Sequence, residues 1–107
     1  MQIDFASSGG VSNRELVFVA DTATMSEREA KEVERLIESS GVFEIEQSNV
    51  NPNVTIGRAD VITYRISLSD DKRQTTLWLN DVSAPVVLRP LLAFLQDLAL
   101  HQKNRGG

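Results

Sequence analysis

The strongest constraint on the fold comes from two alternating segments, 61–69 and 74–80, that flank the turn sequence Asp70-Asp71-Lys72-Arg73. If Asp71 and Lys72 form the centre of the turn, three pairs lie on one face of a hairpin: Ile66 with Leu77, Tyr64 with Leu79, and Leu68 with Thr75. A shift of one residue would oppose apolar with polar positions. The sequence therefore predicts an antiparallel hairpin of fixed register.

The same register places Arg65 beside Trp78 on the opposite face, where a cation–π contact can form. Trp78 lies there because its two neighbours face the core, and Val17 and Val19 of an earlier segment point to the same side. An apolar patch containing Trp and Arg is typical of a protein interface, so Arg65 and Trp78 are secondary interface candidates. The alternative is that residues 46–60 fold over this face and bury it.

A first hairpin precedes this one. Residues 2–7 and 15–21 alternate, and a register that opposes Phe5 with Phe18 puts both apolar sets on one side. The intervening Ser7-Ser8-Gly9-Gly10 lacks the third glycine, the lysine and the following helix of nucleotide-binding loops, so it is interpreted as a tight turn. Ser8, Gly9 and Gly10 are further secondary interface candidates.

Two helices are predicted. Ser26 and Glu29 form a capping box, in which the Ser26 hydroxyl accepts from the Glu29 amide and the Glu29 carboxylate accepts from the Ser26 amide. Apolar residues then recur at helical spacing as far as a left-handed cap at Gly41, which predicts a helix over 26–40. After Ser83, a leucine-rich stripe predicts another helix, which either starts near Pro90 after a short turn or bends there.

The element order ββα, long loop, ββα predicts an α+β fold, with a four-stranded antiparallel sheet and two helices packed on one face. A chain of 107 residues fits one domain, here over 1–101. The tail over 102–107 has no periodicity and is expected to fray.

Composition excludes several classes of function. The formal net charge is −4 and Lys and Arg are not clustered, which disfavours nucleic-acid and membrane-surface binding. The first residues resemble no signal peptide and no segment could span a membrane, so we expect a cytoplasmic protein. There is no cysteine and a single histidine, His101, so we predict no catalytic residue, no metal site and no cofactor. The protein is expected not to be an enzyme, and to be a monomer when free.

Several motifs in order along the chain resemble the emfourin family: Ile3-x-Phe5 with Ser8-Gly9-Gly10, Asp21-Thr22, Glu29-Ala30, Leu36-Ile37-Glu38 with Gly41 and Phe43, Ala59-Asp60 with Tyr64-Arg65-Ile66, and Leu88-Arg89-Pro90-Leu91-Leu92. The resemblance implies a small bacterial inhibitor of thermolysin-like zinc metalloproteases, the M4 family, of the protealysin type. The sequence differs from the family pattern in Val11-Ser12-Asn13 and in the Asn-rich segment 48–53.

Such an inhibitor needs a constrained segment that enters the protease cleft, which prefers a bulky apolar side chain just beyond the scissile bond. The segment that meets this requirement is Asp21-Thr22-Ala23-Thr24-Met25-Ser26, because it ends at the capping box and contains one large apolar residue, Met25. Alternatively, Met25 packs against Ala30 as a hydrophobic staple. A different class of function also stays open, a generic interaction or adaptor module that uses the Trp78 face.

Overall fold

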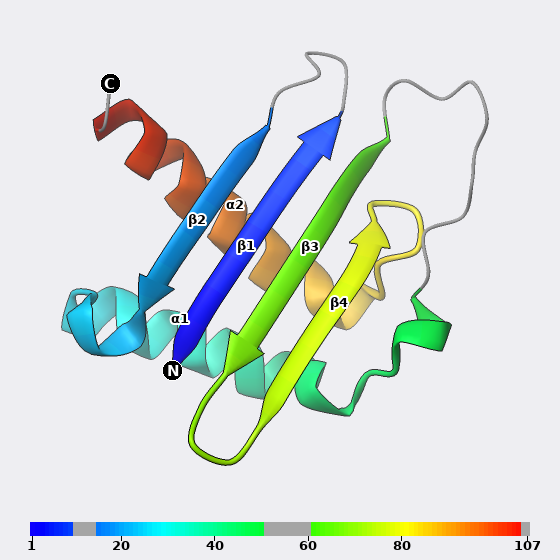
Figure 1. The fold of residues 1–107 in the computed structure, drawn as a ribbon, viewed down its shortest axis with the longest axis horizontal. Coiled ribbons are helices and arrows are strands. Elements are labelled where there is room, and N and C mark those ends of the chain that lie inside the picture. Colours follow the sequence, from blue (N-terminus) through cyan, green and yellow to red (C-terminus); the bar gives the residue numbers. More distant parts are fainter. Residues whose placement is uncertain (10–14, 51–60, 106–107) are drawn as a thin grey trace.

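In the computed structural model, residues 1–9, 15–50 and 61–105 are described, with side chains as far as His101. Within these ranges, four antiparallel strands form one sheet in the order β2-β1-β3-β4 (Figure 1). The strands are β1 (Gln2–Gly9), β2 (Leu16–Asp21), β3 (Ile62–Ser69) and β4 (Gln74–Asn80). The first and third strands are therefore the central pair, although they are far apart in the chain.

The register of both hairpins is the predicted one. Phe5 lies opposite Phe18 between β1 and β2, and the three predicted pairs between β3 and β4 are present: Ile66 with Leu77, Tyr64 with Leu79, and Leu68 with Thr75. The central pairing of β1 with β3, which opposes Phe5 with Ile66, joins the two hairpins into one sheet. All of these apolar side chains consequently lie on the same face.

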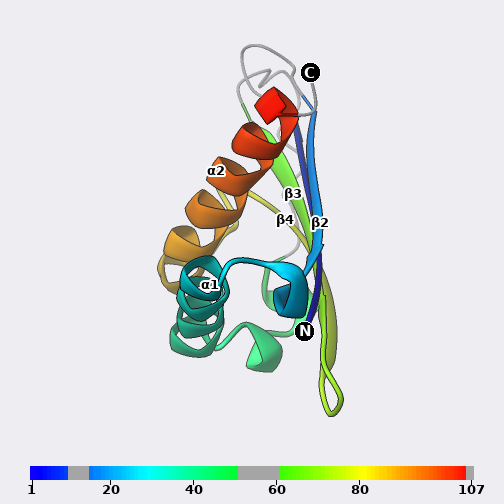
Figure 2. The same cartoon turned by 90° about the vertical axis from the view of Figure 1, so that its left-hand side faces the viewer.

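That face is covered by the two α-helices of the described residues, α1 (Glu27–Ser40) and α2 (Arg89–Arg105), whereas no helix covers the other face (Figure 2). The predicted fold class is confirmed. Short 3-10 helices stand in the connections: η1 (Thr22–Thr24), η2 (Val42–Glu44), η3 (Gln47–Asn49) and η4 (Val86–Leu88). The predicted long loop thus contains η3, and its remainder from residue 51 to 60 lies outside the described residues.

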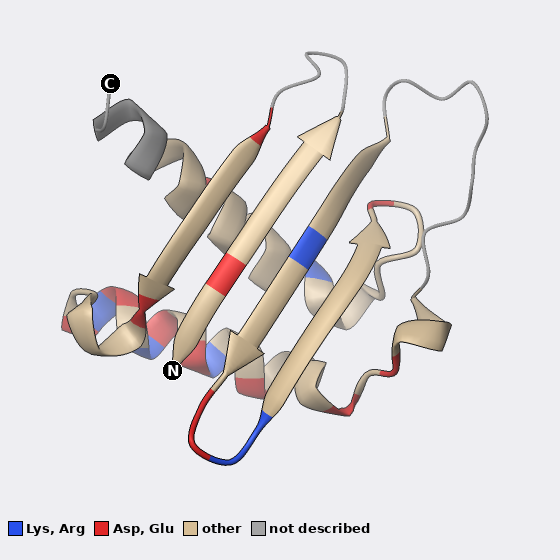
Figure 3. Ribbon diagram, viewed as in Figure 1, with Lys and Arg blue, Asp and Glu red and all other residues tan. Residues whose placement is uncertain are grey.

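The predicted limits of α1 are confirmed. The Ser26 hydroxyl accepts from the Glu29 amide at 3.2 Å, and Gly41 ends the helix with a left-handed backbone at φ 66°. One detail of the capping box differs: the Glu29 carboxylate accepts from the Ser26 hydroxyl at 3.1 Å, where the Ser26 amide was the expected donor. Along α1, exposed glutamates alternate with fewer exposed basic residues, as the red and blue segments of its ribbon show (Figure 3).

The second helix resolves the alternative at Pro90. Val86–Leu88 form a separate short turn and α2 begins at Arg89, so Pro90 stands in the first turn, where its missing N–H costs no helical hydrogen bond. The helix continues to Arg105 and so includes residues 102–105, which the sequence assigned to the fraying tail.

The prediction of a tight turn at Ser8-Gly9 is wrong. Both residues extend β1 and pair with Thr63 and Ile62 of β3, because β1 follows its central partner further than the alternation indicated. Gly9 has φ 99°, and a Cβ atom there would lie 2.6 Å from the Val61 carbonyl oxygen, so this strand end requires glycine. Gly10 lies outside the described residues.

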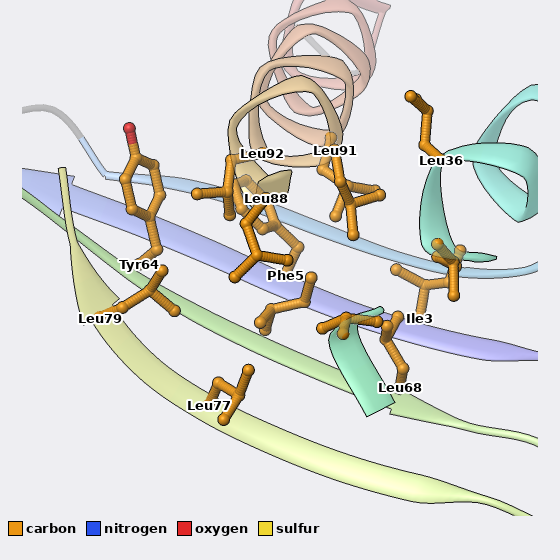
Figure 4. Packing of buried hydrophobic residues seen from close by; sticks show 14 of the residues in the cluster. Ile3, Phe5, Leu36, Tyr64, Leu68, Leu77, Leu79, Leu88, Leu91 and Leu92 are labelled. Atoms are coloured by element: carbon orange, nitrogen blue, oxygen red, sulfur yellow. The ribbon is translucent and has the colours of Figure 1, made fainter. Parts of the chain in front are cut away.

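The core fills the space between the sheet and the helices (Figure 4). Ile3, Phe5, Ile66 and Leu88 are fully buried in it, and the Phe5 ring stacks on Tyr64 with the ring centroids 6.1 Å apart. Because strand residues alternate between faces, this packing fixes which side chains face away from the helices.

Candidate functional site

The segment Asp21–Ser26, called here the cap segment, connects β2 to α1 and is held by local hydrogen bonds. The Asp21 carboxylate accepts from the Ala23 amide at 2.9 Å, and the Thr24 hydroxyl donates to the Asp21 carbonyl at 2.9 Å. The Met25 amide donates to the Thr22 carbonyl at 3.3 Å. The turn is therefore closed at its start by Asp21 and at its end by the Ser26 cap.

The side chains of the cap segment are divided between surface and core. Ala23, Thr24 and Ser26 are exposed, whereas Thr22 is buried and donates its amide to the Met1 carbonyl at 2.9 Å. Met25 is half-buried and packs against the core. The segment thus presents a short, ordered and mostly polar surface, with part of one large apolar side chain accessible.

A second candidate surface lies on the helix-free face of the sheet. This sheet-face patch consists of Val17, Val19, Arg65 and Trp78, and the exposed fractions of its apolar members are 47%, 48% and 53% in that order. Arg65 lies directly opposite Trp78 on β3 and β4, with its guanidinium carbon 5.9 Å from the centroid of the indole ring. The predicted cation–π pair is confirmed.

Arg65 is held in this position from its other side. Its guanidinium donates to the Asp4 carboxylate of β1 at 2.8 Å (the blue segment of β3 and the red segment of β1 in Figure 3). Both side chains are about one-third exposed, so this ion pair contributes little free energy but fixes the orientation of the guanidinium. A shallow hollow of about 270 Å³ lies beside it, lined in part by Ser8, Val17 and Trp78.

Gln47 organises the edge of the sheet next to Trp78. Its side-chain amide donates to the Trp78 carbonyl at 2.7 Å, and its side-chain oxygen accepts from the Trp78 amide at 2.8 Å. One glutamine side chain thereby takes the place of a neighbouring strand and blocks the edge of β4. The sequence gives no signal for this contact, because Gln47 recognises backbone atoms.

A third region also escaped the sequence analysis. Tyr64, Asp81 and Arg89 line a groove of about 350 Å³ beside α2. Burial raises the pKa of the Tyr64 hydroxyl, and the charge of Asp81 raises it further, while Arg89 acts in the opposite direction. Three valines between Asp81 and Arg89 in the sequence are exposed: Val82, Val86 and Val87.

The described residues contain no group of three or more His, Cys, Asp and Glu side chains that could hold a metal ion. His101 is exposed, and its Nδ1 lies 2.8 Å from the Asp97 carbonyl in its own helix. Among the helices of the described residues, none is long and apolar enough to cross a membrane.

Comparison with family models identifies the family of this chain. The Emfourin model matches residues 5–96 of this chain. The chain belongs to the Emfourin family. Comparison with curated proteins and with solved structures gives no match.

Membership of the Emfourin family implies a role as a protease inhibitor in general, which agrees with a protein that is not itself an enzyme. The matched residues of this emfourin include both the cap segment and the sheet-face patch. The family match therefore does not distinguish between the two surfaces, and the choice depends on their physical properties.

Proposed function

We propose that this emfourin inhibits thermolysin-like zinc metalloproteases of the M4 family, as a monomeric cytoplasmic protein without a cofactor. The observation that carries the proposal is the family match over residues 5–96. The inhibitor forms a reversible complex of one inhibitor with one protease and closes the active-site cleft to substrates.

The cap segment enters the cleft. Its backbone is already ordered by the Asp21 and Ser26 caps, so little conformational entropy is lost on binding. The accessible part of Met25 occupies the apolar pocket beyond the scissile position, and packing of the remainder against the core restricts its rotamers.

The hydrogen bonds of the cap segment should also protect the inhibitor from cleavage by the protease. A substrate must lie extended in the cleft, whereas the Thr22 carbonyl is engaged by the Met25 amide in a 3-10 turn. Before the protease could cleave the peptide bond at the Thr22 carbonyl, the 3-10 turn would have to open. We therefore expect the complex to release intact inhibitor.

A peptide-cleavage assay tests this function. A thermolysin-like protease is titrated with the protein, and activity should fall to a plateau at one molar equivalent and return on dilution. Mass spectrometry should find the inhibitor uncleaved, and a serine protease assayed in parallel should keep its activity. Full activity of several M4-family proteases at a several-fold excess of inhibitor would refute the proposal.

The exposure of Trp78 favours a second candidate, a generic interaction or adaptor module that binds its partner through the sheet-face patch. Trp78 is the only tryptophan of the chain and reports on this surface directly. Binding there would shift its fluorescence when the partner is added, whereas binding through the cap segment should leave the emission nearly unchanged. The emission of Trp78 is separated from that of the protease by choosing a protease without tryptophan near its cleft, or by recording difference spectra.

A further inference from the structure

The groove beside α2 combines a charged floor with an apolar wall. Tyr64 and Asp81 approach it from the sheet, Arg89 and Asp97 lie along α2, and the wall includes Ala84, Leu92, Ala93 and Leu100. Tyr64 belongs to the face of β3 that the helices cover, whereas Arg65 and Trp78 lie on the other face. The groove is therefore separate from the sheet-face patch.

Among the described residues, Asp81 is the one with a buried side-chain oxygen that lacks a hydrogen-bond partner. Its backbone is fixed, because the amide donates to the Ile62 carbonyl at 3.0 Å and the carbonyl accepts from Arg89 at 3.1 Å. Its carboxylate oxygen Oδ1 is buried without a hydrogen-bond partner. A carboxylate that has lost water at one oxygen and gained no donor there is unfavourable, and a cation bound in the groove that Asp81 lines would compensate the charge of the carboxylate.

The composition of the groove specifies the kind of cation. Two carboxylates, those of Asp81 and Asp97, stand against one guanidinium, that of Arg89, so the balance of charge is negative. Two carboxylates leave most ligand positions of a calcium ion unfilled, and the described residues contain no group of three or more His, Cys, Asp and Glu side chains that could hold a metal ion. The apolar wall instead suits an alkyl stem, and an ammonium group on such a stem is a lysine side chain.

We propose that the α2 groove binds a lysine side chain of a protein partner, with the ammonium at the Asp81 carboxylate and the stem along Leu92 and Ala93. Exposed valines that are close in sequence to the groove-lining residues Asp81 and Arg89 favour a protein over a free amine. Val82, Val86 and Val87 are 48%, 78% and 55% exposed and would be covered by the surface that carries the lysine. The site goes beyond protease inhibition and does not depend on it.

The test uses the full-length protein labelled with ¹⁵N and the probe N-acetyl-lysine methylamide. Saturable shifts of the backbone amides of Tyr64, Ala84 and Leu92 are expected, with no shift in the cap segment. The neutral norleucine analogue and the acidic glutamate analogue are the controls. Equal binding of norleucine, or preferential binding of glutamate through Arg89, would overturn the proposal.

Two variants locate the binding. Asp81→Asn preserves the shape of the side chain and should weaken lysine binding by about tenfold, the loss typical of a charge-assisted hydrogen bond. Ala93→Trp should abolish binding by filling the groove, without altering Asp81. It tests the site independently if Asp81→Asn does not fold. Unchanged affinity in both folded variants would place the lysine elsewhere and refute the site. None of these readouts involves a protease, so their failure would leave the inhibitory function untouched.

Discussion

The cap segment and the sheet-face patch are built in different ways. The cap segment, Asp21 to Ser26, is held mainly by hydrogen bonds among its own six residues and to the first turn of α1, with one further backbone bond from Thr22 to Met1. The patch is assembled from three strands, and its central Arg65 is held between Asp4 and Trp78, which are far from it in sequence. The cap segment is therefore mainly a local structure, whereas the patch exists only when the sheet has its correct register.

This difference determines how each surface can bind. The patch presents its large apolar side chains about half exposed, so burying them releases hydrophobic free energy at once. The cap segment presents polar and small side chains with one half-buried methionine, so its binding depends on prior order. Removing a cap at Asp21 or Ser26 should affect binding through the cap segment, and disturbing the edge of β4 should affect binding through the sheet-face patch.

The largest expected effect separates the two surfaces directly. Met25→Ala should weaken inhibition by roughly 1 to 3 kcal/mol, about ten- to a hundredfold, because an apolar side chain leaves the protease pocket. Met25→Asp should be worse, since it places a carboxylate in that pocket. Trp78→Ala should leave the inhibition constant unchanged.

Inhibition constants and melting temperatures of these variants are measured side by side. Met25→Leu is the matched control and should retain inhibition, because its volume and apolar character are similar. If Trp78→Ala abolishes inhibition while Met25→Asp inhibits normally, the sheet-face patch is the interface and the cleft-insertion model is wrong.

The next effect sharpens the local character of the cap segment. Ser26→Ala removes the acceptor of the Glu29 amide and should lower the free energy of unfolding by about 1 kcal/mol. Inhibition should fall by more than this, because a frayed start of α1 also releases the segment that must stay ordered. Thermal denaturation and inhibition assays are compared, and a variant with a lower melting temperature but unchanged inhibition would separate the cap from binding.

A smaller effect is expected at the sheet edge. Gln47→Ala removes both hydrogen bonds to the Trp78 backbone and should cost about 1 kcal/mol or less, because water can reach the freed groups. Hydrogen exchange of the Trp78 amide should accelerate, and the tryptophan emission should change while inhibition does not. The control is Gln74→Ala, because Gln74 is an exposed glutamine on β4, the strand that contains Trp78. Exchange at the wild-type rate would mean that Gln47 does not protect this edge.

These regions also differ in how far the sequence predicts them. Alternation in 61–69 and 74–80 is sufficient to predict that Arg65 meets Trp78, and the Ser26 and Gly41 signals predict the limits of α1, because each depends on neighbours in the chain. The pairing of β1 with β3 joins distant segments that share no local signal, so the extension of β1 through Gly9 was missed. The Gln47 contact and the α2 groove were missed for the same reason, since each joins residues from separate elements.

The smallest effect concerns the turn that sets the register of the patch. The Asp70 carboxylate accepts from the amides of Lys72 and Arg73 at 2.8 and 2.6 Å, and these bonds, with a further contribution from the Arg73 side chain, lower the pKa of Asp70. A carboxyl group whose pKa is lower in the folded state stabilises the fold above its unfolded pKa, about 3.9. That contribution is lost as the pH falls through the lower folded value. Asp70 should thus support the β3–β4 hairpin at neutral pH and cease to do so in acid.

Asp70→Ala should therefore melt below the wild type at pH 7, and the difference should shrink as the pH falls below about 4, where the wild type loses the same contribution. Asp71→Ala removes the same charge from the neighbouring exposed position and serves as the control. Melting temperatures are measured over a series of pH values, together with the tryptophan emission as a probe of the patch. Because the hydrogen bonds of the cap segment, within residues 21–29 and to Met1, do not involve Asp70, inhibition by folded Asp70→Ala should equal that of the wild type. A pH-independent gap in melting temperature would show that the turn acts through its backbone shape and not through the Asp70 charge.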